Sequence, residues 1–243
     1  FKENENFIVQ SADKVANIEE KEDCYIINTN TPEYFINYFD LTTDYSLIKK
    51  KLSKYSVMKE PLNYGSGIRI LKQDIFETII SFIVSANNNI KRITKILNKI
   101  RENFGKRIGK YYSFPTLNEL KGANEEYFAK LGAGYRAKYL EKVLKELENF
   151  DIEKSKELPT EELRNKLIAL TGVGPKVADC ILLFAYSRQD VFPVDTWIEK
   201  MYNQFYESCS NRNLIRKKLI DEFGNLSGYA QQYLFYYKRS YLK

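Results

Sequence analysis

The chain has 243 residues, of which 44% are apolar and 29% are charged. This length and composition suit one large domain, or two small ones, with a sizeable core. No stretch approaches the ~18 consecutive apolar residues of a membrane span, and we expect no signal peptide. The chain has no histidine and only three cysteines, which excludes catalytic histidine, histidine-bound zinc and four-cysteine metal sites. The cysteines lie far apart, so we expect no disulfide framework and a cytoplasmic location.

The net charge of +6 is unevenly distributed along the chain. Residues 1–50 carry a formal charge of −5 and the remaining residues +11. Residues 91–110 contain eight basic side chains and a single acidic one, Glu102. Such a run is often only a solvated helix face, but its concentration in one segment is also typical of a nucleic-acid-binding surface.

In chain order, residues 7–30 have the pattern of short β-strands, and the rest of the chain is mainly helical. Thr31 is expected to cap a helix that opens at Pro32, and Asp44 to cap a helix over 43–60. A loop is expected around 61–67. The apolar residues of 75–84 recur at helical spacing with little polar face, which predicts a central helix. The helices expected beyond residue 70 cover 73–86, 89–103, 123–131, 136–149, 159–169, 175–187, 196–206, 212–222 and 228–241.

These elements predict an α+β protein with two parts. Residues 1–60 are expected to form a strand-containing subdomain with a small antiparallel sheet, and residues 61–243 a mainly helical body. Because the chain starts at Phe1 rather than at a methionine, we expect the first part to be incomplete at its start.

The most informative motif is a glycine-rich turn between two helices. Gly172 and Gly174 permit a tight turn with positive φ, and Pro175 stands where the first residue of a new helix is favoured. This pattern predicts a helix-hairpin-helix at about 160–187. The GxxxxGK[ST] motif of a P-loop is absent, and a helix rather than a strand precedes the turn, so neither nucleotide fingerprint applies. Backbone amides at such a helix start form an anion site, and in a basic chain a DNA phosphate is the expected anion.

Three side chains near this turn could carry chemistry. Lys176 lies in the first turn of the second helix, where the helix dipole disfavours an ammonium, so a partly desolvated amine could act as a nucleophile. Cys180 is four residues further on and shares its face, and Asp195 lies just beyond the helix. A carboxylate beside the amine could stabilise an oxocarbenium-like transition state. The ordinary alternatives are a solvated lysine, a core cysteine and a helix-capping aspartate.

Residues 170–178, followed by Val194-Asp195, resemble the active-site segment of the helix-hairpin-helix superfamily of DNA base-excision glycosylases. The downstream cysteine cluster of the endonuclease III branch is missing, so no iron–sulfur cluster is expected. The similarity is greater to the 8-oxoguanine DNA glycosylases and runs from about residue 70 to 241. It also rests on the segments Gln73-Asp74, Ser81-Phe82-Ile83, Asn87-Asn88-Asn89-Ile90, Arg92-Ile93-Thr94, Leu131 to Ala137, Gly228 to Gln231 and Leu234-Phe235.

The resemblance implies a role for each matching residue. Lys176 would be the nucleophile and Asp195 its electrostatic partner. Cys180 and Phe235 would sandwich a flipped base whose Watson–Crick edge Gln231 would bond. The implied DNA contacts are Asn87, Arg92, Tyr135, Arg136, Gly172 and Gly174. The backbone carbonyls of Ile168, Leu170 and Val173 would hold a structural monovalent or calcium-like ion, with no cofactor required.

The function implied is that of a monomeric, bifunctional enzyme that removes 8-oxoguanine from duplex DNA and cleaves the abasic strand. Two alternatives stay open: a glycosylase of the same fold for another damaged base, and a non-catalytic helix-hairpin-helix DNA-binding module. The sequence departs from the family's pattern at two places. The family's N-terminal strand motif, whose glycine carbonyl touches the lesion, is absent, and Trp197 stands where the animal enzymes have histidine.

Overall fold

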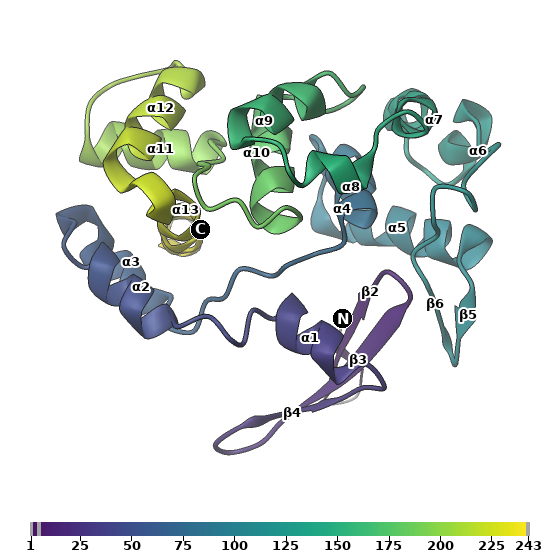
Figure 1. The fold of residues 1–243 in the computed structure, drawn as a ribbon, viewed down its shortest axis with the longest axis horizontal. Helices are drawn as coiled ribbons and strands as arrows, with labels where there is room; N and C mark the ends of the chain where they lie inside the picture. Colours follow the sequence, from purple (N-terminus) through teal and green to yellow (C-terminus); the bar gives the residue numbers. More distant parts are fainter. Residues whose placement is uncertain (1, 4–5, 242–243) are drawn as a thin grey trace.

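The computed structural model describes residues 2–3 and 6–241 of the chain. A small antiparallel sheet at the N-terminus is followed by a mainly helical body, which confirms the expected fold class. The sheet has the order β1-β2-β3-β4. Its strands are β1 (Lys2–Glu3), β2 (Asn6–Ser11), β3 (Lys14–Glu20) and β4 (Tyr25–Asn28). In Figure 1 the sheet lies below the helical body, against α1 and α4.

The helical body follows the expected helices beyond residue 70 closely, with bounds that differ by at most three residues. The central helix is α4, in which Ile79, Ile80 and Ile83 are fully buried, as expected. The helices are α1 (Pro32–Tyr38), α2 (Tyr45–Leu52), α3 (Lys59–Tyr64), α4 (Ile75–Ser85), α5 (Ile90–Phe104), α6 (Glu125–Lys130), α7 (Arg136–Leu147), α8 (Ile152–Ser155), α9 (Thr160–Ile168), α10 (Pro175–Phe184), α11 (Thr196–Phe205), α12 (Arg212–Phe223) and α13 (Ser227–Tyr241).

The segment expected as one helix over 43–60 is divided. Asp44 caps α2 as expected, its carboxylate accepting from the Ser46 and Leu47 amides, but α2 ends at Leu52. A 3-10 turn at Ser56–Met58 precedes α3, which continues through the expected loop to Tyr64. Pro61 lies in the first turn of α3, where its missing N–H has no helical acceptor.

Other expectations were wrong in detail. Thr31 stands at the N-cap position of α1, but its side chain makes no capping hydrogen bond. Pro32 is the first residue of the helix, as expected. The short hairpin of β5 (Arg107–Ile108) and β6 (Tyr111–Tyr112), and the four-residue α8, were not predicted. Such short elements bury too few apolar residues to leave a periodic pattern.

The buried side chains form separate clusters. The largest surrounds α4 and joins it to α5–α7, α9 and α10. A second combines α2 and α3 with the last three helices, so chain segments far apart in sequence pack together (Figure 1). The division of the chain near residue 60 remains a prediction. The two clusters meet at one place: α10 belongs to the first and α13 to the second, and both helices flank the same space.

The sheet is tied to the body through Glu77 of α4. Its carboxylate accepts from the Ala12 amide at 2.7 Å, in the turn between β2 and β3, and forms an ion pair with Arg101 of α5. The Phe114 amide donates to the Ala12 carbonyl at 2.7 Å. In the part of the chain that the structure describes, no helix has the length and apolarity needed to cross a membrane.

Candidate active site and DNA-facing surface

The predicted helix-hairpin-helix is formed by α9, a turn and α10. Gly172 has φ +86, and an added Cβ would lie only 3.2 Å from Tyr139 Cβ, so both conformation and space require glycine. Gly174 differs from the expectation of positive φ: it is extended, with φ −87, and caps α10. The amides of Gly172 and Gly174 donate to no acceptor in the described part of the chain. They are therefore available to an anion at the start of α10.

A second contact holds this turn in place from α7. The Glu146 carboxylate accepts from the Thr171 amide at 2.7 Å and from the Thr171 hydroxyl at 2.5 Å. Because the Thr171 amide is already bonded, it is not available to an anion, which would be bound by the amides that follow it. Sequence analysis missed Glu146, since nothing in the spacing connects it with the turn.

A cavity of about 170 Å³ lies between α4, α10, α13 and the loop before α11. It brings together five residues predicted as chemistry-bearing or base-binding, Lys176, Cys180, Asp195, Gln231 and Phe235, and three that were not, Phe82, Phe184 and Gln232. The rings of Phe82 and Phe184 are nearly parallel, with centroids 6.0 Å apart. The cavity therefore combines flat apolar walls with a few polar groups, which suits a planar heterocycle.

Lys176 reaches the cavity from the first turn of α10. Its Nζ lies 5.4 Å from the centroid of the Phe82 ring, an arrangement that places the amine over an aromatic face. Within the part of the chain that the structure describes, Lys176 and Asp195 line the same cavity but form no ion pair. The amine and the carboxylate therefore line one space without neutralising each other directly.

Asp195 caps α11, as the structural alternative predicted, and also lines the cavity. Its Oδ1 accepts from the Trp197 and Ile198 amides, each at 3.0 Å. Both bonds use the same oxygen, so Oδ2 stays available to a group in the cavity. The two roles are compatible, because the cap fixes the carboxylate at a helix start that stabilises its charge.

Cys180 forms a buried wall of the cavity, with 4% exposure. Burial raises the pKa of the Cys180 thiol to about 11, against the opposing effect of the Lys176 ammonium. The thiol is therefore protonated near neutral pH and offers a polarizable, uncharged surface rather than a nucleophile.

Gln231 is buried, with 4% exposure, and its side-chain amide is already bonded. Its Nε2 donates to the Pro193 carbonyl at 3.1 Å, and its Oε1 accepts from Gln232 Nε2 at 2.6 Å. The resemblance implies that Gln231 bonds a base edge, and with these two bonds made, one N–H and one oxygen lone pair remain available for it.

A second group of predicted DNA-contacting residues lies in two segments: residues 86–92, which run from the end of α4 into the first turn of α5, and residues 132–136, which lead into α7. We call these two segments the strand loops. Arg92 donates to the Gly132 carbonyl through Nε and Nη2, at 3.3 and 2.9 Å. Tyr135 is 54% exposed, and its hydroxyl donates to the Ala86 carbonyl at 3.1 Å. Gly134, at φ +61, leaves room for Arg92, whose Nη2 would lie 3.2 Å from an added Cβ.

Arg136 differs from the expected DNA contact. It is 2% exposed, and its guanidinium donates to the carbonyls of Ala86, Asn87 and Ala133. Asn87 has φ +48, a conformation that a non-glycine residue holds only when its surroundings support it. Arg136 therefore holds the loop that presents Asn87, rather than facing solvent.

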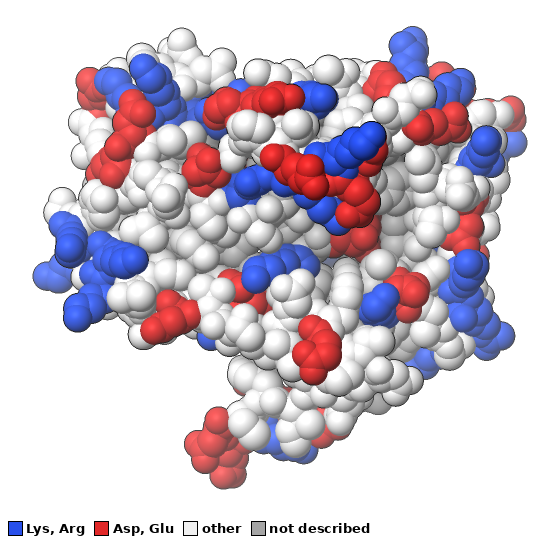
Figure 2. All heavy atoms as spheres, viewed as in Figure 1, with Lys and Arg blue, Asp and Glu red and all other residues white. Residues whose placement is uncertain are grey.

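The basic segment 91–110 is not a uniform surface. Arg101 is partly buried and pairs with Glu77, Lys106 pairs with Glu119, and Lys110 pairs with Glu3. Among the described residues, Lys91 and Lys95 of α5 are exposed and have no acidic partner. On the face shown in Figure 2, basic and acidic side chains are interspersed, with a basic cluster over α2 and α3.

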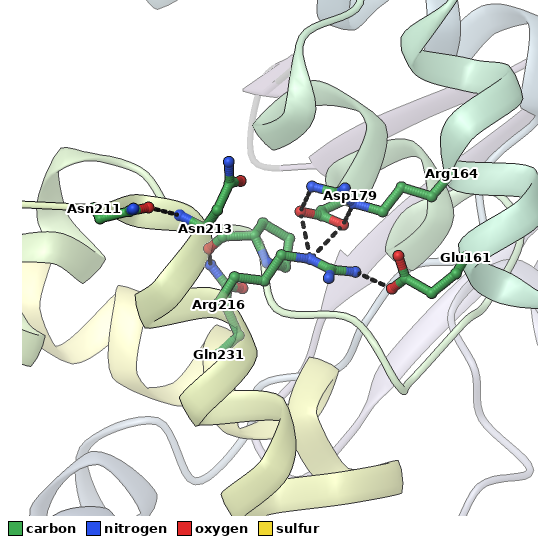
Figure 3. A network of polar contacts seen from close by, with 8 residues as sticks. Glu161, Arg164, Asp179, Asn211, Asn213, Arg216 and Gln231 are labelled. Atoms are coloured by element: carbon green, nitrogen blue, oxygen red, sulfur yellow. Dashed lines mark hydrogen bonds and ion pairs between the residues drawn. The ribbon is translucent and has the colours of Figure 1, made fainter.

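A larger, more polar hollow of about 510 Å³ lies on the other side of Lys176, between the hairpin and α12. One wall is the network drawn in Figure 3, in which Asp179 accepts from Arg164 and Arg216. Arg216 also pairs with Glu161 at 2.7 Å. Burial raises the pKa of the Asp179 carboxyl, and the two guanidiniums oppose that shift. The network joins α9, α10 and α12 and so holds the helix that carries Lys176.

The predicted ion site consists of backbone carbonyls at the end of α9. The Leu170 carbonyl accepts from the Val173 amide at 3.1 Å, whereas those of Ile168 and Val173 accept no turn hydrogen bond from the described backbone. Carbonyls at a helix C-terminus attract cations. Among the described side chains, no cluster of three or more acidic, cysteine or histidine residues could hold a metal ion.

The family models divide the chain into two consecutive parts. Residues 80–223 match the HhH-GPD superfamily of base excision DNA repair proteins, and residues 1–79 match the 8-oxoguanine DNA glycosylase N-terminal domain. The superfamily model alone spans more than half of the chain. The chain therefore belongs to the HhH-GPD superfamily and, within it, to the 8-oxoguanine DNA glycosylases.

Relatives and solved structures agree with this assignment. A probable N-glycosylase/DNA lyase of Methanothermobacter thermautotrophicus is 31% identical, over 83% of this chain and 71% of that protein. An N-glycosylase/DNA lyase of Saccharomyces cerevisiae is 36% identical, but the chain spans only 56% of its length. A Clostridium acetobutylicum 8-oxoguanine glycosylase/lyase, bound to duplex DNA with cytosine opposite 8-oxoG, superposes with a TM-score of 0.93 at 40% identity, over 99% of this chain and 87% of that chain.

Proposed function

We propose that the chain is a bifunctional DNA glycosylase that removes 8-oxoguanine from duplex DNA and then cleaves the abasic strand. The observation that carries the proposal is the single cavity lined by the Lys176 amine, the Asp195 carboxylate and the Cys180, Gln231 and Phe235 side chains. The family assignment and the named activity of the relatives support it. A DNA-binding module without catalysis would have no use for this combination.

In the proposed reaction, the neutral Lys176 amine attacks the anomeric carbon of the damaged nucleotide. The bond from that carbon to the base breaks, and the base leaves with the bonding electrons and takes up a proton. Asp195 stabilises the positive charge that develops on the sugar. The nitrogen bonded to C1′ then loses a proton and the C1′–O4′ bond opens, with the proton passing to O4′, which leaves a protonated Schiff base between Lys176 and C1′. Loss of a proton from C2′ then expels the C3′ oxygen with its phosphate, which breaks the strand. Every group in this scheme belongs to the chain, so no cofactor is required.

The base must leave the DNA stack before Lys176 can reach the sugar, which costs a few kcal/mol. In the proposed complex, the base lies between the neutral Cys180 thiol and the Phe235 ring, and Gln231 bonds its Watson–Crick edge. The apolar walls of the cavity and its small volume of about 170 Å³ support this placement. Stacking of a base on an aromatic ring contributes about 1–3 kcal/mol.

The strand loops and the hairpin would hold the duplex. We assign Asn87 to the space that the base vacates, Tyr135 to the stack beside it, and Arg92 to the unpaired opposite base. The Gly172 and Gly174 amides would bind a phosphate, and the carbonyls at Ile168, Leu170 and Val173 would bind a monovalent or calcium-like ion. The enzyme would act as a monomer in the cytoplasm, on chromosomal DNA.

The test is covalent trapping of the Schiff base. With an 8-oxoguanine duplex and borohydride, the unaltered chain should form a stable protein–DNA adduct, and Lys176→Gln should form none while still binding the duplex. Lys145→Gln is a matched control, because Lys145 is an exposed lysine of α7 paired with Glu141. Trapping by Lys176→Gln would assign the chemistry to another amine.

A panel of duplexes, each with a different damaged base, tests the identity of the substrate. Preferential release of another base would replace 8-oxoguanine as the substrate.

A further inference from the structure

Gln232 was not singled out from the sequence, yet it lines the cavity beside Gln231. The two glutamines are neighbours in α13, and their side-chain amides meet: Gln232 Nε2 donates to Gln231 Oε1 at 2.6 Å. Gln231 Nε2 in turn donates to the Pro193 carbonyl at 3.1 Å. A chain of two hydrogen bonds therefore runs from α13 to the loop that ends at Asp195.

The direction of this chain follows from chemistry. A backbone carbonyl can only accept, so the end of the Gln231 amide that faces Pro193 must be its NH2 group. The other end, which faces Gln232, is then the oxygen, and Gln232 must supply a donor. Reversing the Gln231 amide would place two acceptors against each other at Pro193, in a buried position where unmade hydrogen bonds are costly.

We propose that Gln232 is a positioning residue that, together with the Pro193 carbonyl, locks the Gln231 amide in one orientation, and that this lock makes the cavity select guanine-type over adenine-type base edges. The inference rests on the proposed function, in which the cavity receives the flipped base. It adds a specificity element that the roles assigned above do not contain.

The selectivity follows from the order of donors and acceptors on the two edges. A guanine-type edge presents the O6 acceptor beside the N1 donor, whereas an adenine-type edge presents the N6 donor beside the N1 acceptor. The locked Gln231 retains one N–H and one oxygen lone pair in a fixed order. When a guanine-type base lies with O6 at the free N–H and N1–H at the free lone pair, both hydrogen bonds form. An adenine-type base in the same position would set donor against donor and acceptor against acceptor. Binding the other edge requires the amide to turn over, which breaks the bond to Pro193 and the bond from Gln232.

The experiment compares two lesions that share an oxidised imidazole ring and differ in their Watson–Crick edge, 8-oxoguanine and 8-oxoadenine. Single-turnover base release is measured for each, opposite cytosine, with the unaltered chain and Gln232→Leu. We expect Gln232→Leu to slow 8-oxoguanine release roughly 3- to 10-fold, the net effect of about one hydrogen bond, and to narrow the ratio between the two lesions. Cleavage at a preformed abasic site, which involves no base, should be unchanged.

Two further variants separate positioning from general damage. Gln10→Leu is a matched control, because Gln10 is a half-buried glutamine of β2 that donates to the Tyr112 carbonyl and does not line the cavity; it should behave like the unaltered chain. In a Gln231→Ala background, Gln232→Leu should have no further effect, since its role acts through Gln231. Gln232→Asn, which keeps the polar group but shortens its reach, should behave like Gln232→Leu.

An unchanged lesion ratio in Gln232→Leu would overturn the inference, as would an equal effect of this substitution with and without Gln231. Parallel loss of base release and abasic-site cleavage would assign Gln232 a general structural role and would also overturn it. If the unaltered chain releases no 8-oxoguanine at all, the proposed function fails instead, so the two failures are distinguishable.

Discussion

The cavity beside Lys176 and the strand loops serve the same DNA in different ways, and their architectures differ accordingly. In the cavity, side chains from α4, α10 and α13 converge on a half-open space whose inner wall, Cys180 and Gln231, is almost fully buried. At the strand loops, Tyr135 and Arg92 lie at the surface: each donates to a backbone carbonyl, and the Tyr135 ring also contacts Tyr139 and Arg136. Burial strengthens electrostatic interactions at a reacting centre, whereas exposed groups can enter a helix from outside. Substitutions in the cavity should therefore affect the reaction most, and those at the strand loops should affect recognition.

Among substitutions in the cavity, Asp195→Asn should have the largest effect on base release. Asparagine caps a helix about as well as aspartate, so the free energy of unfolding should change by less than about 1 kcal/mol. The charge that stabilises the developing cation is lost, and base release should fall by about 10²- to 10³-fold. Single-turnover kinetics and thermal unfolding of the same preparation test both statements. Near-normal release with an intact fold would limit Asp195 to its capping role.

Phe235→Ala should have the next largest effect. Loss of the stacking face should weaken retention of the flipped base by about 1–3 kcal/mol, measured as slower base release. Phe184→Ala is an informative comparison, because Phe184 also lines the cavity but stacks against Phe82 within the protein. Equal losses in base release and in cleavage of a preformed abasic site would show that Phe235 supports the fold rather than the base.

The cavity was more predictable from the sequence than its internal bonding. The spacing of Lys176 and Cys180 on one helix face, and of Gln231 and Phe235 on another, correctly places each pair in a common space. Gln232 was missed because adjacent helical residues point about 100° apart, so its contact with Gln231 depends on side-chain conformation. Periodicity likewise places Ile79 and Ile83 in the core but does not reveal that Asp179 joins Arg164 and Arg216.

The strand loops show a related limit. The resemblance assigned Arg136 to DNA, but its guanidinium donates to carbonyls of the 86–87 and 133 backbone. Arginine carries five donors, and loop carbonyls from a segment about 50 residues away compete for them. Loop conformation decides that competition, and loop conformation is what spacing along a chain specifies least.

For the strand loops, Arg92→Ala should change which opposite base is preferred. Arginine can donate two hydrogen bonds to the acceptors of an unpaired cytosine, and adenine offers a poorer match. We expect the unaltered chain to release 8-oxoguanine faster opposite cytosine than opposite adenine, and the variant to lose about 1–3 kcal/mol of that preference. Because Arg92 is an exposed side chain, the fold should be nearly unaffected. Equal release opposite all four bases by the unaltered chain would contradict this role of Arg92.

The smallest effect is expected for Lys91 and Lys95, two exposed lysines of α5 without an acidic partner among the described residues. Lys91 and Lys95 lie one turn apart, and Lys95 is three residues from Arg92, so they share the helix side on which the strand loops meet α5. If each neutralises a phosphate, Lys91→Gln and Lys95→Gln together should reduce the slope of log affinity against log salt by about 1.8, or about 0.9 for each lysine.

Duplex affinity measured between low and moderate salt tests this expectation, because loss of a phosphate contact changes the slope and loss of a neutral contact changes only the intercept. Lys106→Gln and Lys110→Gln are the matched controls: both lysines belong to the same basic segment but pair with Glu119 and Glu3. Substituting them should change the slope less, since a lysine bound to a carboxylate is less available to a phosphate. An equal change for both pairs would mean that the whole segment faces the duplex, and the distinction between recognition by the strand loops and a general basic surface would not hold.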